Sequence, residues 1–200
     1  MPTIAIDFGT TRTKVAYFDP DHREPRLIEL GYEVRAVIPS LFYLPPDGPP
    51  LVGDSAQQMI DEDPEGVVVG LKKEIHKLGK YRCGGGRPSI DRRELAGHLF
   101  RYIREQCELE VFHGERVSEC VLTVPVAFED QKRECIREAA RKGGFERIAM
   151  VDEPVAAARA WLAKAGQKVA QHVVVCDVGG GTTDFALLRH DRGRFESVPE

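Results

Sequence analysis

The chain has 200 residues, of which 42% are hydrophobic and 30% are charged, and its formal net charge is −4. This composition is typical of a soluble globular protein with one or two domains. The negative net charge argues against a nucleic-acid-binding surface, which is normally basic.

The cysteines and the N-terminus indicate the compartment. The five cysteines are an odd number and show no C-x-x-C spacing. This pattern favours free thiols in a reducing cytosol and argues against a disulfide framework or a zinc site. Residues 1–4 lack the basic segment and apolar run of a signal peptide. No apolar run approaches the roughly 20 residues that cross a bilayer. We therefore expect a soluble, cytoplasmic protein.

A predicted hairpin opens the chain. The apolar run 4–6 ends at Asp7, Phe8-Gly9-Thr10-Thr11-Arg12-Thr13 follows, and residues 14–18 form the return strand. Glycine lets the backbone approach a ligand closely, and successive free N–H groups in a turn form an anion-binding concavity. By itself this motif fits an ordinary turn as well as a phosphate site.

The next segment predicts short, irregular elements. Residues 26–30 and 34–44 carry strand-forming side chains, and Pro39 places the second run at a sheet edge or delays its start. Residues 44–50 form a proline-rich surface loop.

A short helix is expected over residues 55–61, capped by Asp54 or Ser55. Residues 67–73 are a brief apolar run that ends in a lysine pair. The glycines at 84–86 lack the flanking strand and helix of a phosphate loop, which favours a linker.

The following elements alternate between helix and strand. Asp91 caps an amphipathic helix over 92–109, whose apolar side chains indicate core packing. His98 and His113 have no metal-ligand partners at suitable spacing. Val117 to Pro125 is expected to be a strand.

A second helix begins at Glu129-Asp130-Gln131 and ends before Gly143 and Gly144. Residues 148–151 form another strand, and Pro154 suits the first turn of the helix that follows. Glu153, between that strand and helix, lies where α/β sheets often bind ligands, although a helix cap is the simpler interpretation.

The last predicted hairpin is the richest in glycine. Strand residues 173–176 lead into Asp177-Val178-Gly179-Gly180-Gly181-Thr182-Thr183-Asp184, and residues 185–188 return. A two-residue turn needs only one or two glycines, so phosphate binding is favoured here. Two hairpins with the same order of Asp, Gly and Thr in one chain strengthen that interpretation. A third strand follows at 195–198, and the whole order predicts an α/β fold with a mixed sheet.

Four segments together resemble the ATPase domain of DnaK-type, seventy-kilodalton heat-shock chaperones, which share a superfamily with actin and sugar kinases. They are Ile6 to Thr11, Val121 to Arg133, Asp152 to Ala158 and Asp177 to Asp184. The resemblance covers nearly the whole chain. It implies a ribonuclease H-like or actin-like ATPase lobe with a mixed five-stranded sheet, a small inserted subdomain and the start of a second lobe.

The resemblance also implies ATP or ADP and Mg²⁺ as ligands. Phosphate contacts would come from the first turn through Gly9, Thr10 and Thr11, and from the second through Gly179, Gly180, Gly181 and Thr182. Asp7 and Asp177 would hold a hydrated Mg²⁺ between them.

The implied catalytic residues are Lys72, Glu153, Asp177 and Asp184, with Lys73 as an alternative to Lys72. Glu153 would contact water on the metal, and Lys72 would reach the γ-phosphate. Pro125 and Arg133 would relay the nucleotide state to the rest of a chaperone.

The chain departs from the family in three respects. The segment between residues 39 and 90 is short, Thr183 replaces a common aromatic residue, and the sequence stops at Glu200. We therefore expect a piece of a longer protein that contains the first lobe and the opening hairpin of the second. Residues 171–200 are expected to be poorly ordered or packed on another copy, because an isolated ribbon is only marginally stable.

Three units are predicted: 1–38 with 91–170 as the lobe core, 39–90 as the insertion, and 171–200 as the second-lobe hairpin. The implied partners are ATP, a C-terminal peptide-binding or effector domain, and co-chaperones, without nucleic acid or membrane. Two alternatives stay open: a filament-forming actin-like ATPase and a carbohydrate kinase, since residues 7–14 also fit the opening of the kinases.

Overall fold

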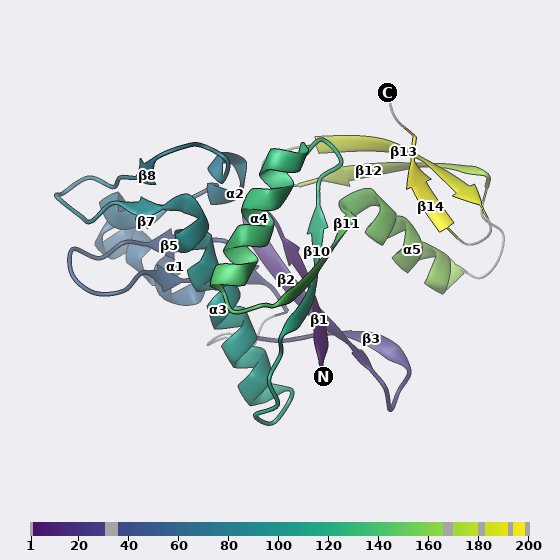
Figure 1. Cartoon of the computed structure of the whole chain (residues 1–200), viewed down its shortest axis with the longest axis horizontal. Coiled ribbons are helices and arrows are strands. Elements are labelled where there is room, and N and C mark those ends of the chain that lie inside the picture. Colours follow the sequence, from purple (N-terminus) through teal and green to yellow (C-terminus); the bar gives the residue numbers. More distant parts are fainter. Residues whose placement is uncertain (1, 31–35, 166–169, 180–182, 192–193, 199–200) are drawn as a thin grey trace.

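The structure is a computed structural model that describes residues 2–30, 36–165, 170–179, 183–191 and 194–198. A mixed sheet with strand order β11-β10-β1-β2-β3 forms its centre, and the short strand β4 pairs with β2 beside this path (Figure 1). The strands are β1 (Thr3–Phe8), β2 (Arg12–Asp19), β3 (Glu24–Leu27), β4 (Ile38–Pro39), β10 (Glu119–Val124) and β11 (Arg147–Asp152).

The sheet combines two directions. Strands β11, β10 and β1 run parallel, whereas β1, β2 and β3 run antiparallel. The predicted mixed α/β sheet of five strands is confirmed, with β4 as an addition that contains Pro39. In β1 the side chains of Ile4, Ile6 and Phe8 are buried and alternate with more exposed residues, as expected for a strand with one face on the core.

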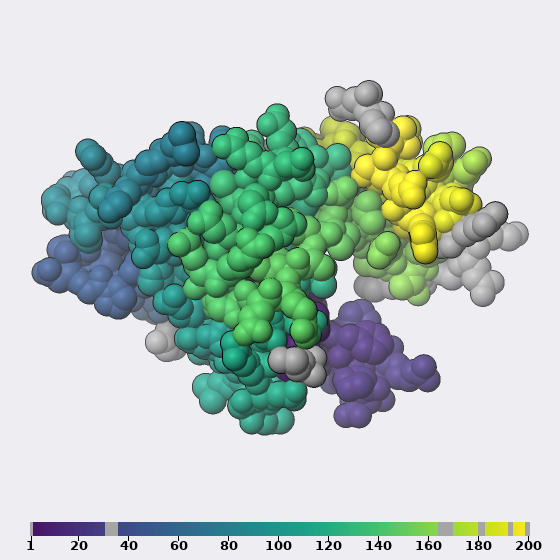
Figure 2. Space-filling view, in the orientation of Figure 1, coloured from purple at the N-terminus to yellow at the C-terminus, as the bar shows by residue number. Residues whose placement is uncertain are grey.

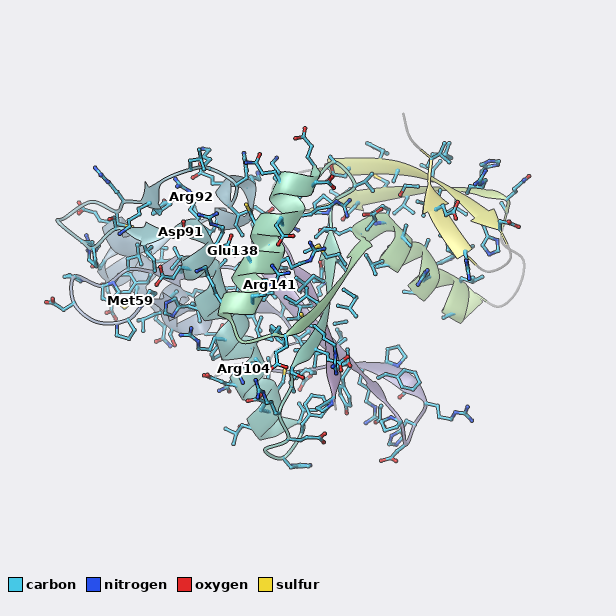
Figure 3. All side chains as sticks on the ribbon, viewed as in Figure 1. Met59, Asp91, Arg92, Arg104, Glu138 and Arg141 are labelled. Atoms are coloured by element: carbon cyan, nitrogen blue, oxygen red, sulfur yellow. The ribbon has the colours of Figure 1, made fainter. Side chains whose placement is uncertain are left out.

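Two long helices cover that face of the sheet. They are α3 (Arg92–Glu110) and α4 (Asp130–Lys142), and both were predicted. The Asp91 side chain caps α3 by accepting hydrogen bonds from the backbone N–H groups of Arg93 and Glu94. Arg93 also contacts Glu138 of α4, so the start of α3 is tied to the neighbouring helix. Figure 3 labels Asp91 at the start of α3 and Glu138 on α4.

The predicted insertion contains only short elements. They are β5 (Phe42–Tyr43), β6 (Leu51–Val52), α1 (Asp54–Glu62), a 3₁₀ turn (Pro64–Gly66), β7 (Val67–Val68), α2 (Leu71–Glu74), β8 (Lys80–Tyr81) and β9 (Ile90–Asp91). The predicted helix at 55–61 is present, but the prediction of its cap was wrong. Gly53 occupies the cap position without a side-chain hydrogen bond, because Asp54 already lies in the first helical turn.

A second sheet lies at the other end of the molecule. It consists of β12 (His172–Val178), β13 (Thr183–Asp191) and β14 (Arg194–Ser197), which are all antiparallel. Helix α5 (Glu153–Ala165) contacts both this sheet and strands β10 and β11. Figure 2 shows the insertion and the second sheet at opposite ends, with α3 and α4 between them.

A small apolar cluster joins the second sheet to α5. Its buried members are Val155, Ala158, Leu188 and Phe195. The sequence predicted that residues 171–200 are poorly ordered or packed on another copy, and that stays a prediction. Within the described residues, Leu188 and Phe195 are buried, whereas Phe185 and Leu187 are exposed. None of the described helices combines the length and apolar character that a transmembrane span requires.

Candidate functional site

A cleft of about 850 Å³ lies where the insertion, the central sheet and the second sheet approach each other. It opens at the β1–β2 turn, at α2, after β10, at the start of α5 and at the tip of the β12–β13 hairpin. Most of the site residues predicted from the sequence line it. They are Asp7, Gly9, Thr10, Thr11, Lys72, Lys73, Pro125, Glu153, Asp177, Gly179 and Asp184.

The β1–β2 turn is tight. The Gly9 N–H donates to the carbonyl oxygens of Asp7 and Arg12, at 3.1 and 3.0 Å. A Cβ at position 9 would lie 2.3 Å from the Arg12 carbonyl oxygen, so glycine is required by close approach. Within the described residues, the backbone N–H groups of Thr10 and Thr11 donate to no other backbone group, which leaves two donors beside the cleft.

Asp7 is oriented by the neighbouring strand. The hydroxyl group of Thr123 on β10 donates to Asp7 Oδ1 at 2.7 Å. On the other side, Asp7 is the cross-strand partner of Lys14, which also lines the cleft. The carboxylate is therefore oriented by a hydroxyl donor, and a cationic residue occupies the paired position on β2.

Lys72 and Glu153 form an ion pair, with Lys72 Nζ 2.7 Å from Glu153 Oε1. The Lys72 side chain is only 5% exposed, and that of Glu153 is 16% exposed. Lys73, the alternative, is exposed. The simpler interpretation of Glu153 as a helix cap missed this contact, because the partner lies in a distant segment of the chain.

The pKa of Glu153 is raised above its ordinary value. Burial is the largest cause, Lys72 opposes it, and the negative charges of Asp7 and Asp177 add to it. Two carboxylates from other elements, β1 and β12, therefore act electrostatically on Glu153 in the cleft. Among the described residues, no group of three His, Cys, Asp or Glu side chains converges closely enough to bind a metal ion directly.

The second hairpin contributes two more carboxylates. Asp177 on β12 and Asp184 on β13 are cross-strand partners, and both are exposed. Like charges directly opposite each other destabilise a sheet, so a cation between them would be favourable. Gly179 lines the cleft next to this pair. Gly180, Gly181 and Thr182 lie outside the described residues.

Arg133 on α4 connects three segments behind the cleft. Its guanidinium group donates to the carbonyl oxygen of Phe128 at 2.7 Å and to that of Pro125 at 3.4 Å. The same group donates to the Asp152 carboxylate at 2.7 Å, one residue before Glu153. Pro125 and Arg133, predicted to act together, are therefore in direct contact.

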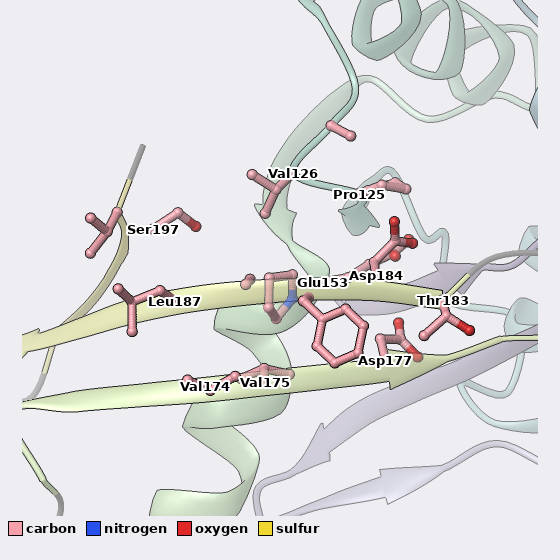
Figure 4. Close-up of a pocket in the computed structure, with 15 residues that line it drawn as sticks. Pro125, Val126, Glu153, Val174, Val175, Asp177, Thr183, Asp184, Leu187 and Ser197 are labelled. Atoms are coloured by element: carbon pink, nitrogen blue, oxygen red, sulfur yellow. The ribbon is translucent and has the colours of Figure 1, made fainter. Parts of the chain in front are cut away.

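A second pocket of about 900 Å³ adjoins the cleft and shares Pro125, Glu153, Asp177 and Asp184 with it. Figure 4 shows the acidic residues Asp177 and Asp184 at one end of this pocket and Leu187 at the other. The charged groups therefore gather where the two pockets meet.

Several residues in or beside the cleft were not assigned a role from the sequence. The clearest are Lys14 and Lys132, which line the cleft, and Thr123, which contacts Asp7 from outside the cleft lining. Lys14 could have been found because it lies across the hairpin from Asp7, and Lys132 because it directly precedes Arg133. The contact of Thr123 with Asp7 depends on which strands pair, which the sequence pattern alone does not give.

Comparison with known proteins gives a consistent result. Residues 79–199 match the family description "Hsp70 protein". The chaperone protein DnaK of Elusimicrobium minutum is 31% identical over 196 residues, covering 96% of this chain and 31% of that protein. The chaperone protein DnaK of Thermotoga neapolitana is 29% identical over 198 residues, covering 98% of this chain and 32% of that protein.

The chain spans about a third of the length of these two curated relatives. The matches confirm the resemblance drawn from the four sequence segments, and they do not favour the actin-like or carbohydrate kinase alternatives. Since the family match covers more than half of the chain, this protein belongs to the Hsp70 protein family.

Proposed function

We propose that this chain is the nucleotide-binding part of a DnaK-like chaperone, in which Mg²⁺-dependent binding and hydrolysis of ATP drive a conformational change. One observation carries the proposal: a single cleft is lined by both Asp-Gly-Thr hairpins, by a buried lysine and by Glu153. Phosphoryl transfer depends mainly on positioning and on stabilisation of charge, and these groups supply both.

The two turns would hold the phosphate groups. Thr10 and Thr11 offer backbone N–H donors from the β1–β2 turn, and Gly9 allows the close approach. Gly179 would contribute from the second turn, together with the glycines at 180 and 181 and Thr182. Backbone donors of this kind suit an anion because they are fixed before it binds.

Asp7 and Asp177 would hold a hydrated magnesium ion. The donor set fits, because Mg²⁺ prefers oxygen ligands, binds through one or two carboxylates and retains several waters. The electrostatic effect of both residues on Glu153 supports a cleft with accumulated negative charge. When bound, the ion supplies positive charge that offsets the charge of the phosphate oxygens.

The chain's own residues would then act as follows. Lys72 places a buried positive charge beside the phosphate groups, and Glu153 fixes the position of its ammonium group. Asp184 is the exposed carboxylate that would orient the attacking water or accept its proton. The low exposure of Lys72 strengthens its electrostatic effect, because less water screens it.

Pro125 and Arg133 would relay the nucleotide state. The proposal is supported by the hydrogen bonds of Arg133, which join the loop after β10 to Asp152. A displacement of Glu153 would therefore also displace Asp152, its neighbour in the chain, and, through Arg133, the loop after β10. The further partners, a peptide-binding or effector domain and co-chaperones, remain part of the proposal for the whole protein.

The same three units stay part of the proposal. Residues 1–38 with 91–170 would form the lobe core, residues 39–90 the insertion, and residues 171–200 the opening of the second lobe. The apolar cluster of Val155, Ala158, Leu188 and Phe195 would join the last of these units to α5 of the core.

The test is nucleotide binding by the 200-residue chain. Phosphorus NMR and calorimetry with ATP and Mg²⁺ should detect weak, millimolar binding. The reason is that, among the described residues, a small cluster with four buried members, Val155, Ala158, Leu188 and Phe195, holds the second half of the cleft in place. Hydrolysis by this chain should be slow.

Two variants and one control sharpen this test. K72M and D177N should each abolish the binding, because they remove the buried cation or one metal carboxylate. E65Q changes an acid that is 71% exposed and outside the cleft, and it should bind as the wild type does. Micromolar binding by the chain would contradict the weak-binding proposal. No binding at all, or equal binding by every variant, would contradict the proposed site.

A further inference from the structure

Lys132 lines the same cleft but has no role in the site described above. It lies in the first turn of α4, which begins at Asp130. Its Nζ atom is 5.1 Å from the centre of the Phe128 ring, and Lys72 Nζ is 5.7 Å from the same centre. One aromatic ring therefore contacts the ammonium groups of two lysines that both face the cleft.

The two lysines differ in how their charge is balanced. Lys72 forms the ion pair with Glu153. Lys132 forms no ion pair and no hydrogen bond with any residue that the structure describes, and its recorded contact is with the ring of Phe128. A cation–π contact of this kind contributes only about 0.5–1 kcal/mol where water has access. The positive charge of Lys132 is therefore largely uncompensated.

The position of Lys132 is also electrostatically unfavourable for the helix. The N-terminus of an α-helix carries partial positive charge, so an acidic side chain stabilises its first turn and a lysine destabilises it. The stability of α4 therefore does not explain why a lysine occupies position 132 in its first turn. An anion in the cleft would explain it, because such an anion would attract both Lys132 and the N-terminus of α4.

We propose that Lys132 is a second phosphate-binding cation of the cleft, positioned by Phe128 and distinct from the Lys72–Glu153 pair. The inference rests on the proposed nucleotide-binding function and adds a residue that selects for the number of phosphate groups. Lys132 would contact the outer phosphates of ATP or ADP, so its contribution should be nearly absent for AMP, which has one phosphate.

The test compares K132Q, K132R and a matched control with the wild-type chain. The control is K142Q, which changes an exposed lysine in the last turn of the same helix. Calorimetry or phosphorus NMR would measure binding of ATP, ADP and AMP with Mg²⁺. We expect K132Q to weaken ATP and ADP binding about tenfold, as for loss of one charged hydrogen bond, and to change AMP binding less than about twofold. K132R should retain most of the affinity, and K142Q all of it.

A second readout is independent of affinity. Acetylation of lysines, followed by mass spectrometry, should show Lys132 protected by ATP and by inorganic tripolyphosphate, while Lys142 stays reactive. F128L keeps an apolar side chain but removes the aromatic ring, so it should reduce this protection and weaken ATP binding while leaving the fold intact.

The outcomes separate the two proposals. If the wild-type chain binds ATP and K132Q binds it with the same affinity, the role of Lys132 is overturned and the proposed function stands. The same holds if K132Q loses equal affinity for ATP and for AMP. A wild-type chain that binds neither nucleotide nor tripolyphosphate at millimolar concentration, with every cleft lysine unprotected, would overturn both.

Discussion

Lys72 Nζ lies 2.7 Å from Glu153 Oε1, although the two residues are 81 positions apart in the sequence. The lysine comes from α2 in the insertion, and the glutamate comes from the start of α5 beyond the central sheet. This ion pair therefore links α2 to the start of α5 across the cleft. It also brings the lysine proposed to contact the phosphate groups into direct contact with the acid proposed to contact water on the metal.

Breaking this pair should destabilise the protein. K72M leaves a mostly buried Glu153 next to Asp7 and Asp177 without its cation. We expect the free energy of unfolding to fall by about 2–3 kcal/mol. This is at or just below the loss that is usual when one partner of a fully buried ion pair is removed. Urea unfolding followed by circular dichroism would measure it. E153Q should cost less, because its amide oxygen still accepts from Lys72 and one negative charge is removed.

A surface ion pair provides the control for that measurement. Lys77 contacts Glu74 at 2.6 Å, but its side chain is 54% exposed. K77M should change stability by less than about 1 kcal/mol. If K72M and K77M lower the free energy of unfolding equally, the Lys72–Glu153 pair stabilises the protein no more than an exposed ion pair does.

Arg133 should control the loop after β10. R133Q removes the donors to the carbonyl oxygens of Pro125 and Phe128 and to the Asp152 carboxylate. Hydrogen exchange of residues 125–129 should become faster, and stability should fall by about 1–3 kcal/mol because charged hydrogen bonds are lost. R141Q, which removes an exposed contact with Glu134, is the control. Unchanged exchange in R133Q would be inconsistent with a relay through this residue.

The close turn at Gly9 gives a third prediction. In G9A the added methyl group would lie 2.3 Å from the Arg12 carbonyl oxygen, so the β1–β2 turn must open. We expect a loss of about 1–3 kcal/mol in stability and no detectable ATP binding. In G84A the nearest atom is the end of the Glu65 side chain at 3.4 Å, and this variant should behave as the wild type does. Normal ATP binding by G9A would exclude a phosphate contact at this turn.

The lowered pKa of Asp91 predicts that the protein loses stability as the pH falls. Hydrogen bonds and charge from Arg93, with the backbone N–H groups of α3, lower the Asp91 pKa from 3.8 to about 2. An acid whose pKa is lower in the folded state stabilises the protein above its unfolded pKa. That stability is lost as the pH falls from about 4 toward 2.

The measurement compares D91A with the wild type at two pH values. At pH 6 we expect D91A to be less stable by about 2 kcal/mol, and at pH 3 the difference should be roughly half as large. D91N keeps a capping side chain without the charge, so the difference between D91N and D91A should stay constant with pH. A wild-type advantage that does not shrink at pH 3 would contradict the lowered pKa.

The sequence predicted the elements of the fold more completely than the contacts within the site. Strand alternation in β1, the Asp91 cap and the glycines after α4 act locally, so their positions could be predicted from neighbouring residues. The Lys72–Glu153 and Thr123–Asp7 contacts join segments 81 and 116 positions apart. They depend on strand order and on the docking of the insertion.

The two glycine- and threonine-rich turns also show which features could be predicted from the sequence. Their glycine and threonine content indicated phosphate binding, but only the structure shows that the Gly9 N–H is used inside the turn. The role of Gly9 is therefore to permit close packing, and the remaining donors belong to Thr10 and Thr11. Pattern alone does not distinguish a free N–H group from one that closes the turn.

Phe195 should hold the second sheet onto the rest of the protein. It is 4% exposed and packs with Val155, Ala158 and Leu188, whereas Phe185 of the same sheet is 71% exposed. F195A should remove about 3 kcal/mol of apolar packing from the cluster that joins α5 to the second sheet. F185A removes the same side chain from an exposed position, so it should have a small effect.

Hydrogen exchange would distinguish these variants. In F195A the amides of β12 and β13 should exchange much faster while those of β1 and β10 stay protected, since the main core does not include Phe195. ATP binding should also weaken, because Asp177 and Asp184 would no longer face Asp7 across the cleft. Equal protection of β12 and β1 in F195A would mean that the second sheet is held by contacts other than this cluster. Faster exchange in F185A than in F195A would place the stabilising contacts on the opposite face of the sheet.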